Sequence, residues 1–370
     1  MKLAVAAALL GLAVPGVSLA GAYLTPVGAA PPGLSPLATA VGGRALAQPK
    51  DGGTRYAYQW PGVYFEAAFK GSHAFFEIGP GDEILHLLVD GQEAARLVRP
   101  PAGYYRLDGL TAGEHIVRIE VATESQAGPA VFGGFSLDAE AQPLPAPRRL
   151  RQIEFIGDSH TVGYGDLSTK RDCTEHEIWE TTDTSVAYGP ILARRFGADY
   201  QVNAISGHGI VRNYGGFPGD PVPAAHPFVL FDKAQRYDDA AWRPQVIVIA
   251  LGTNDFSTPL HAGEPWPTRD ALRADYEATY VRFVRRLRAR DPDALIVLWA
   301  TDGAEGEIQA EVGKVAAQLR AGGETRLAFV PVNDLQMGAC NGHPNLADHA
   351  AIADKLMQAI DLVPDAWRGR

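Results

Sequence analysis

The stretch Ile156-Gly157-Asp158-Ser159-His160-Thr161 decides the fold of the larger part of this chain. It follows a predicted strand, Gln152 to Ile156, and its glycine allows the backbone to turn sharply. A serine hydroxyl on such a turn stands clear of the sheet edge. Ser159 is therefore a candidate nucleophile, although a serine at a strand-to-helix turn is also a common helix N-cap.

Three later stretches contain the other groups that ester hydrolysis needs, which are a base and donors for the oxyanion. They are Asn203-Ala204-Ile205-Ser206-Gly207-His208-Gly209, Ile249-Ala250-Leu251-Gly252-Thr253-Asn254-Asp255 and Cys340-Asn341-Gly342-His343-Pro344-Asn345. His343 is the candidate base. The backbone N–H groups of Ser159 and Gly207 and the side chain of Asn254 are the candidate donors. Each residue alone is explained as a turn or loop residue, so the prediction depends on their occurring together.

In order and type these four blocks resemble the SGNH (GDSL-like) hydrolases, with Ser159, Gly207, Asn254 and His343 at the signature positions. The resemblance covers about Arg149 to the end of the chain. It implies a serine hydrolase that uses no metal and no cofactor.

The pattern after residue 149 alternates strands with helices. Val246 to Ala250, Leu295 to Trp299 and Leu327 to Val330 are continuous apolar runs, as in parallel strands covered on both faces. Three helices are predicted in this part of the chain: Thr184 to Phe196, Thr268 to Arg290, and a last one capped by Asn345 and running to about Ile360. The fold class is therefore α/β, a three-layer α/β/α sandwich with a parallel sheet over residues 149–370.

The preceding part of the chain shows short alternating strands instead. Val63 to Phe69 and Val117 to Val121 alternate side-chain character, and Asp90-Gly91 is a strong two-residue hairpin signal. An all-β jelly-roll domain is expected over residues 51–140. Residues 141–148 are predicted to be a stiff proline-rich linker, and residues 23–50, rich in Ala, Gly and Pro, a flexible lead-in.

Residues 1–22 have the pattern of a secretory signal peptide. Lys2 precedes the apolar run Leu3 to Val14, and small residues allow cleavage after Ala20 or Ala22. The run is too short to span a bilayer and is followed by Pro15. We therefore expect a secreted or periplasmic protein with no membrane anchor after cleavage.

Composition and charge restrict the partners that this protein can bind, but they do not decide whether its two cysteines form a disulfide. The chain has 370 residues, of which 46% are hydrophobic and 21% charged, as in a globular protein. Its formal charge of −10 repels phosphate backbones, so nucleic acid is not an expected partner. Cys173 and Cys340 form one disulfide after export, or are two free buried thiols.

Other catalytic motifs are excluded by spacing. Thr161 stands where the α/β-hydrolase elbow G-x-S-x-G requires glycine, and Gly207 to Arg212 lacks the third glycine of a dinucleotide fingerprint. No P-loop, H-E-x-x-H or C-x-x-C occurs. His343, Asp348 and His349 match no zinc spacing, so a metal site is not expected.

Within the SGNH enzymes the chain resembles the family 2 carbohydrate esterases. The resemblance rests on the N-terminal jelly-roll pattern, the Gly-Asp-Ser block, Tyr188-Gly189, Ser206-Gly207-His208-Gly209 and the ending His343-Pro344-Asn345, from about Tyr56 onward. It implies a serine esterase that removes O-acetyl groups from xylan- or glucomannan-type polysaccharide or oligosaccharide.

One position departs from the SGNH pattern. The family usually places an aspartate three residues before the histidine, and here that residue is Cys340. Some family 2 members are known to use a Ser-His dyad in which a backbone carbonyl replaces the acid. We predict a dyad of Ser159 and His343, with Asp334 and Asp348 as the nearest acids in sequence if a triad exists instead.

Two other functions remain open at this point: a lipase, arylesterase or thioesterase of the same fold, and an inactive carbohydrate-binding protein. Intact Ser159, Asn254 and His343 argue against the inactive form. Trp266 is a candidate sugar platform, and its alternative is a rim aromatic packed on the neighbouring prolines.

Overall fold

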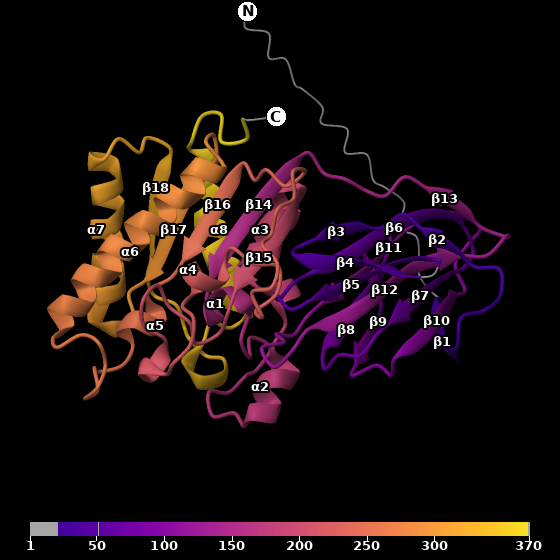
Figure 1. Cartoon of the computed structure of the whole chain (residues 1–370), viewed down its shortest axis with the longest axis horizontal. Helices are drawn as coiled ribbons and strands as arrows, with labels where there is room; N and C mark the ends of the chain where they lie inside the picture. The colour runs from indigo at the N-terminus through magenta and orange to yellow at the C-terminus, as the bar shows by residue number, and fades with distance from the viewer. Residues whose placement is uncertain (1–20, 51, 369–370) are drawn as a thin grey trace, which may run out of the picture.

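The chain folds into an antiparallel β-sandwich followed by an α/β region built on a parallel sheet (Figure 1). The computed structural model describes residues 21–50 and 52–368. This two-part architecture confirms the predicted fold class. The predicted signal peptide lies almost entirely in residues 1–20, outside the described residues.

The sandwich contains a seven-stranded and a six-stranded sheet. The first has the order β1-β10-β7-β12-β5-β4 with β2 on β12, and the second the order β13-β6-β11-β8-β9 with β3 on β6. Phe65 on β6 and Phe132 on β12 stack between the sheets with ring centroids 4.5 Å apart. The strands are β1 (Tyr23–Gly28), β2 (Ser35–Leu37), β3 (Ala40–Gly42), β4 (Ala45–Lys50), β5 (Gly53–Tyr58), β6 (Tyr64–Gly71), β7 (Ala74–Ile78), β8 (Ile84–Val89), β9 (Gln92–Val98), β10 (Gly103–Asp108), β11 (Gly113–Val121), β12 (Ala130–Leu137) and β13 (Gln142–Leu144).

Two expectations for this region were wrong. Residues 23–50 are not a flexible lead-in but form β1 to β4, and the linker 141–148 begins with β13. Proline, which cannot donate to a ladder, is confined mainly to edge strands. Pro26, Pro49 and Pro143 lie in β1, β4 and β13, each at an end of its sheet order. The composition that suggested disorder is therefore the composition of edge strands.

The α/β region has five parallel strands in the order β15-β14-β16-β17-β18. Because side chains alternate across a strand, Phe155 and Ile156 face opposite layers. Helices α3 and α8 pack on the Phe155 side, and α6 and α7 on the Ile156 side (Figure 1). The strands are β14 (Arg151–Gly157), β15 (Ala198–Ala204), β16 (Val246–Ala250), β17 (Leu295–Thr301) and β18 (Leu327–Val332).

The three predicted helices are present with one difference, and the structure adds helices that were not predicted, the longest of which is α7. The segment predicted as a helix from Thr184 to Phe196 divides at Ala187, which is extended with ψ 162°. Pro190 lies in the first turn of the helix that follows, where its missing N–H has no cost. The helices are α1 (Ser159–Val162), α2 (Glu175–Thr181), η1 (Thr184–Val186), α3 (Tyr188–Phe196), η2 (Tyr214–Gly216), α4 (Val222–Ala225), α5 (Thr253–Phe256), α6 (Arg269–Arg290), η3 (Ala304–Gly306), α7 (Glu307–Ala321), η4 (Cys340–Gly342) and α8 (Leu346–Asp361).

Buried ion pairs join the sandwich to the α/β region. Arg44, between β3 and β4, binds Glu154 of β14 at 3.1 Å, and both side chains are at most 1% exposed. His86 of β8 contacts Asp183 at 2.8 Å. Removing such charges from water is costly unless they are paired, so these contacts specify how the two parts fit together.

The carboxyl ends of the parallel strands meet at one edge of the sheet, where α1 and α5 follow β14 and β16 (Figure 1). This is the edge at which α/β folds place their ligands. Among the helices in the described part of the chain, none has both the length and the apolar character needed to cross a bilayer.

Candidate active site

Ser159 and His343 meet at this edge although 184 positions separate them in sequence. Ser159 is the first residue of α1, and His343 Nε2 lies 2.9 Å from its Oγ. The N-cap of α1 is Asp158, whose carboxylate accepts the N–H of His160 at 3.1 Å. The helix cap is therefore supplied by Asp158, and the Ser159 hydroxyl is free to contact the imidazole.

The second nitrogen of His343 contacts a backbone carbonyl. Its Nδ1 lies 2.9 Å from the oxygen of Cys340. Because a carbonyl oxygen can only accept, Nδ1 must carry the hydrogen, which leaves Nε2 to accept from the serine hydroxyl. Burial lowers the pKa of His343 to about 4, opposed by its bond to the Cys340 carbonyl. The imidazole is therefore neutral at pH 7.

The two acids nearest to His343 in sequence, Asp334 and Asp348, do not contact its ring. Asp348 lies in the first turn of α8 and accepts the N–H groups of Gln336 at 2.7 Å and Met337 at 2.9 Å. Asp334 is exposed. Among the described residues, no carboxylate forms a hydrogen bond or ion pair with His343.

A disulfide holds the segment that carries His343. Cys173 and Cys340 are bonded, with Cα atoms 5.5 Å apart, and the described residues contain no free cysteine. The N–H of Asn341 also donates to the carbonyl of Arg171 at 2.7 Å. The residue whose carbonyl binds the imidazole is thus covalently tied to the loop that follows α1.

Gly207 and Asn254 lie at the same cavity as Ser159 and His343. The cavity has a volume of about 710 Å³. Gly207 adopts φ +82°, which favours glycine, and Asn254 Nδ2 donates to the carbonyl of His208 at 3.0 Å and to Asp158 at 3.3 Å. The other residues that line the cavity are Gln126, His160, Tyr164, Ser206, Tyr214, Phe217, Thr253, Ser257, Asn341 and Gly342.

Asp255 connects the Asn254 segment to the Gly207 segment. Its carboxylate, which is fully buried, accepts the N–H groups of Ile210 at 3.0 Å, Val211 at 2.9 Å and Arg212 at 2.9 Å. Burial raises its pKa to about 6. Burial and the nearby Asp255 likewise raise the pKa of Asp158 to about 7. The two candidate donor segments are therefore held by one side chain.

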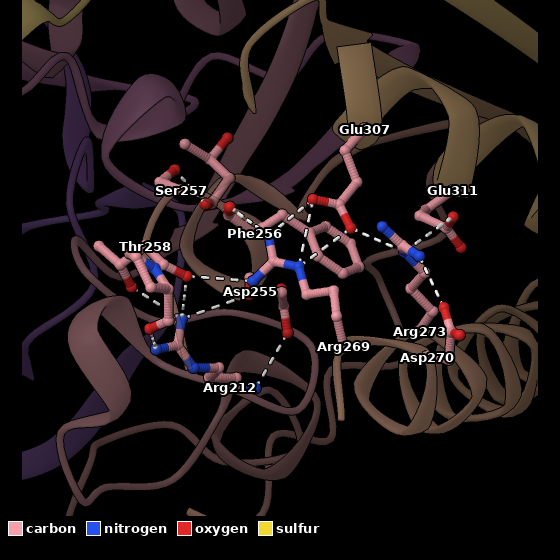
Figure 2. Close-up of polar contacts among 12 residues, drawn as sticks. Arg212, Asp255, Phe256, Ser257, Thr258, Arg269, Asp270, Arg273, Glu307 and Glu311 are labelled. Carbon is pink, nitrogen blue, oxygen red and sulfur yellow. Dashed lines mark hydrogen bonds and ion pairs between the residues drawn. The ribbon is translucent and has the colours of Figure 1, made fainter. Parts of the chain in front are cut away.

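Two arginines hold the chain that follows Asp255 (Figure 2). Arg212 donates to the hydroxyl of Thr258 at 2.8 Å, and Arg269 donates to the carbonyl of Thr258 at 3.0 Å and pairs with Glu307 at 2.7 Å. Sequence reasoning missed these residues. The only sequence signal near these arginines' partners was Asp255 directly after Asn254, and the run Thr253-Asn254-Asp255 is equally typical of a turn.

The β-sandwich also reaches the cavity, through the loop between β11 and β12. Glu124 accepts the N–H of Ser206 at 2.8 Å, and Gln126 donates to the carbonyl of the same residue at 3.1 Å. Gln126 is a cavity residue. The sandwich therefore supports the segment that contains Gly207.

The structure corrects the expectation for Trp266. Its ring does not line the cavity, and its indole N–H donates to Asp275 of α6 at 3.0 Å. The exposed aromatic rings at the cavity are those of Tyr214 and Phe217, in and beside η2. The partner of Trp266 therefore lies on the neighbouring helix, which the sequence did not reveal.

Comparisons with known proteins agree with this arrangement. Residues 41–147 match the family described as carbohydrate esterase 2 N-terminal, and residues 155–357 match the GDSL-like lipase/acylhydrolase family. An acetylxylan esterase/glucomannan deacetylase of Cellvibrio japonicus is 42% identical over 351 residues, which are 94% of this chain and 98% of that protein.

Solved structures are similar over nearly the whole chain. One is a carbohydrate esterase with 42% identity and a TM-score of 0.84, covering 90% of this chain and all of that one. Another is a family two carbohydrate esterase of Clostridium thermocellum in complex with cellohexaose, with 28% identity and a TM-score of 0.76, covering 88% of this chain and 98% of that one. The chain therefore belongs to the GDSL-like acylhydrolases and, within them, to the family 2 carbohydrate esterases, and it is a hydrolytic esterase.

Proposed function

We propose that the protein removes O-acetyl groups from xylan- or glucomannan-type carbohydrate through a dyad of Ser159 and His343. The observation that carries this proposal is the chain of two contacts from Ser159 Oγ to His343 Nε2 and from His343 Nδ1 to the Cys340 carbonyl, each 2.9 Å. It contains a nucleophile, a neutral base and a group that orients the base.

In the first step, the Ser159 oxygen attacks the acetyl carbonyl while His343 Nε2 takes its proton. The N–H groups of Ser159 and Gly207 and the amide of Asn254 stabilise the oxyanion. Asn254 makes its longer contact, 3.3 Å, with Asp158, and this is the contact that a substrate oxygen would replace. The bond between the acetyl carbon and the sugar oxygen then breaks, and the imidazolium gives its proton to that oxygen, so the sugar leaves as an alcohol and Ser159 carries the acetyl group.

In the second step, a water molecule attacks the acetyl-enzyme. His343 takes a proton from the water and returns it to the Ser159 oxygen as acetate leaves. The Cys340 carbonyl accepts from Nδ1–H throughout, so it holds the ring and stabilises the imidazolium as a dipole rather than as a full charge.

The relatives and the cavity rim support a carbohydrate substrate. One relative is named an acetylxylan esterase/glucomannan deacetylase, and another is bound to cellohexaose. The rings of Tyr214 and Phe217 are 55% and 40% exposed at the cavity, and flat aromatic faces pack well against the apolar faces of sugar rings. We assign these two rings the role that the sequence had suggested for Trp266.

The test compares acetate release from acetylated xylan and glucomannan with turnover of acetyl, butyryl and longer-chain chromogenic esters. We expect acetate release from the polysaccharides, a steep fall beyond the acetyl ester, and loss of both activities in Ser159→Ala. Equal activity on long acyl chains would favour a lipase, and no turnover of any ester would favour an inactive binding protein.

We also propose that the protein is exported, because residues 1–22 have the pattern of a signal peptide. N-terminal sequencing of the protein from its producing cells tests this. A mature chain that begins at Gly21 or Tyr23 supports export, whereas an intact Met1 on the active protein contradicts it.

A further inference from the structure

A second cavity, of about 180 Å³, lies at the end of α6 that is remote from the catalytic edge of the sheet. Four arginines line it: Arg44 of the sandwich, Arg236 of the loop after α4, and Arg286 and Arg290 of α6. We call it the arginine cavity. Its other residues are His226, Pro227, Tyr237 and Leu287.

Only two of the four guanidinium groups have carboxylate partners. Arg44 and Arg290 both bind Glu154, and Arg290 also binds Asp291. Arg286 donates to the carbonyl of Pro223 at 2.6 Å, which carries no formal charge. The Arg236 guanidinium lies 5.3 Å from the ring of Phe228, and neither it nor Arg286 forms an ion pair with any described residue.

The buried member of the cluster also has an unused donor. Arg44 is 1% exposed, and its Nε has no hydrogen-bond partner among the described residues. Its guanidinium lies 5.4 Å from the ring of Trp60 and 4.7 Å from that of Tyr237. The two Nη groups donate to the carbonyls of His226 and Phe228 and to Glu154, so Nε is the donor of Arg44 that has no partner among the described residues.

The charges around the arginine cavity repel one another. Arg286 is exposed at one side and packed at the other; this partial burial lowers its pKa, and the neighbouring Arg236 and Arg290 lower it further. Burial and Arg44 lower the pKa of His226 to about 3, so this imidazole is neutral at pH 7 and neither adds to the positive charge nor cancels it. A negative ligand would relieve the repulsion.

The fold alone does not account for this cluster. Cations are favourable in the last turn of a helix, which explains Arg290 at the end of α6. That effect does not extend to Arg236, which comes from a loop, and the chain as a whole carries a charge of −10. The excess of positive charge is therefore local to the arginine cavity.

We propose that the arginine cavity binds a small oxyanion, a carboxylate or a phosphate group. Guanidinium groups match both chemistries because their planar N–H donors form paired hydrogen bonds with carboxylate and phosphate oxygens. The volume is below the range of about 300–1,000 Å³ typical of drug-sized ligands, so a single sugar acid or phosphate group is the appropriate size. The site is independent of the proposed deacetylation.

The test is calorimetric titration of the whole protein with inorganic phosphate, with D-glucuronate and with neutral D-glucose, at constant ionic strength set with sodium chloride. We expect saturable binding of at least one of the two anions, with one site per chain, and none of glucose. Phosphate binding without glucuronate binding would assign the site to phosphate groups, and the reverse would assign it to sugar acids.

The variant Arg236→Gln/Arg286→Gln locates the site, because both residues are exposed and neither binds Glu154. Arg282→Gln is the matched control, since Arg282 is also exposed on α6 but does not line the cavity. We expect the double variant to bind at least about tenfold more weakly, a change of about 1.4 kcal/mol, and the control to bind as wild type.

Both variants should keep wild-type esterase turnover and circular dichroism. The proposal is overturned if neither anion binds saturably up to about 10 mM, which corresponds to a negligible affinity. It is equally overturned if the double variant, folded as wild type, binds the anion unchanged.

Discussion

At the residue scale, the backbone carbonyl of Cys340 is the partner of the proposed base, His343. The carbonyl of Cys340 accepts from His343 Nδ1 at 2.9 Å and sets the same tautomer that an aspartate would set. A neutral dipole stabilises the imidazolium less than a full charge does. We therefore predict that His343 acts as the base without an acidic partner.

The first prediction follows for the neighbouring acids. Asp334→Asn and Asp348→Asn should each keep kcat within about tenfold of wild type, because neither carboxylate contacts His343, whereas His343→Ala should lose several orders of magnitude. Steady-state turnover of an acetyl ester measures this. A thousandfold loss in either aspartate variant, with an unchanged circular dichroism spectrum, would mean that an acid completes a triad.

The second prediction concerns the pH dependence of kcat/KM. Only neutral His343 can take the serine proton, so activity falls as pH drops through its pKa. An unperturbed imidazole would give this fall near pH 6.5, as in model peptides, but burial lowers the pKa of His343 to about 4. We expect the acidic limb of the free enzyme to lie well below pH 6.5. A midpoint at about pH 6.5 or above would contradict this reading of the site.

At the element scale, the loops after α1 and before α8 are joined by the disulfide between Cys173 and Cys340. The third prediction is that Cys173→Ser lowers kcat about ten- to hundredfold, because small displacements of a catalytic base are costly. Free energy of unfolding should fall by about 2–4 kcal/mol, as is typical for a lost native disulfide.

Thiol titration under denaturing conditions gives the control for this variant. The wild-type protein should show no reactive thiol without reductant, and two after reduction. Unchanged kcat in Cys173→Ser would show that hydrogen bonds alone, such as that from Asn341 to the Arg171 carbonyl, are sufficient to hold His343.

The fourth prediction concerns the connection between the segments of Gly207 and Asn254. Asp255 accepts three backbone N–H groups, and an amide at this position would offer one oxygen in place of two. Asp255→Asn should therefore lower kcat by about ten- to hundredfold while changing KM much less, because oxyanion donors act mainly in the transition state.

Asp270→Asn is the matched control for Asp255→Asn. Its carboxylate is 88% exposed and pairs with Arg273 on the surface of α6. We expect wild-type kinetics and a stability change within about 1 kcal/mol, as for exposed ion pairs. If Asp255→Asn changes KM alone, the residue contributes to substrate binding and not to the position of the oxyanion donors.

At the scale of the whole molecule, Glu154 links the two parts of the chain. It is fully buried on β14 and binds Arg44 from the sandwich at 3.1 Å, together with His226 at 2.8 Å and Arg290. An interface with a buried charge of this kind tolerates the loss of one partner poorly. We therefore expect the sandwich and the α/β region to unfold together.

The fifth prediction is that Glu154→Gln lowers the free energy of unfolding by about 3–5 kcal/mol, because Arg44 stays buried without a carboxylate. Denaturant titration followed by circular dichroism measures it. Asp354→Asn, which removes a surface pair with Arg195, should change stability by less than about 1 kcal/mol. A loss below about 1 kcal/mol in Glu154→Gln would show that the interface does not depend on this charge.

The sequence by itself determined the elements whose signals are local. Apolar runs predicted β16 and β17, the Asp90-Gly91 pair predicted the hairpin of β8 and β9, and Thr268 and Asn345 marked the starts of α6 and α8. Each signal lies within one turn or one strand, where backbone propensity and side-chain period act directly. The four blocks around Ser159, Gly207, Asn254 and His343 were identified differently, by their resemblance in order and type to the SGNH hydrolases.

Only the tertiary structure decided the features that depend on partners distant in sequence. The proline-rich segments are edge strands because each pairs with a strand that lies elsewhere in the sequence. Trp266 lies outside the cavity, and its N–H donates to Asp275 of α6. The partner of His343 Nδ1 is a main-chain oxygen, which no residue type encodes. The arginine cavity likewise gathers side chains from the sandwich, a loop and α6, so its charge appears only when three separate segments are packed together.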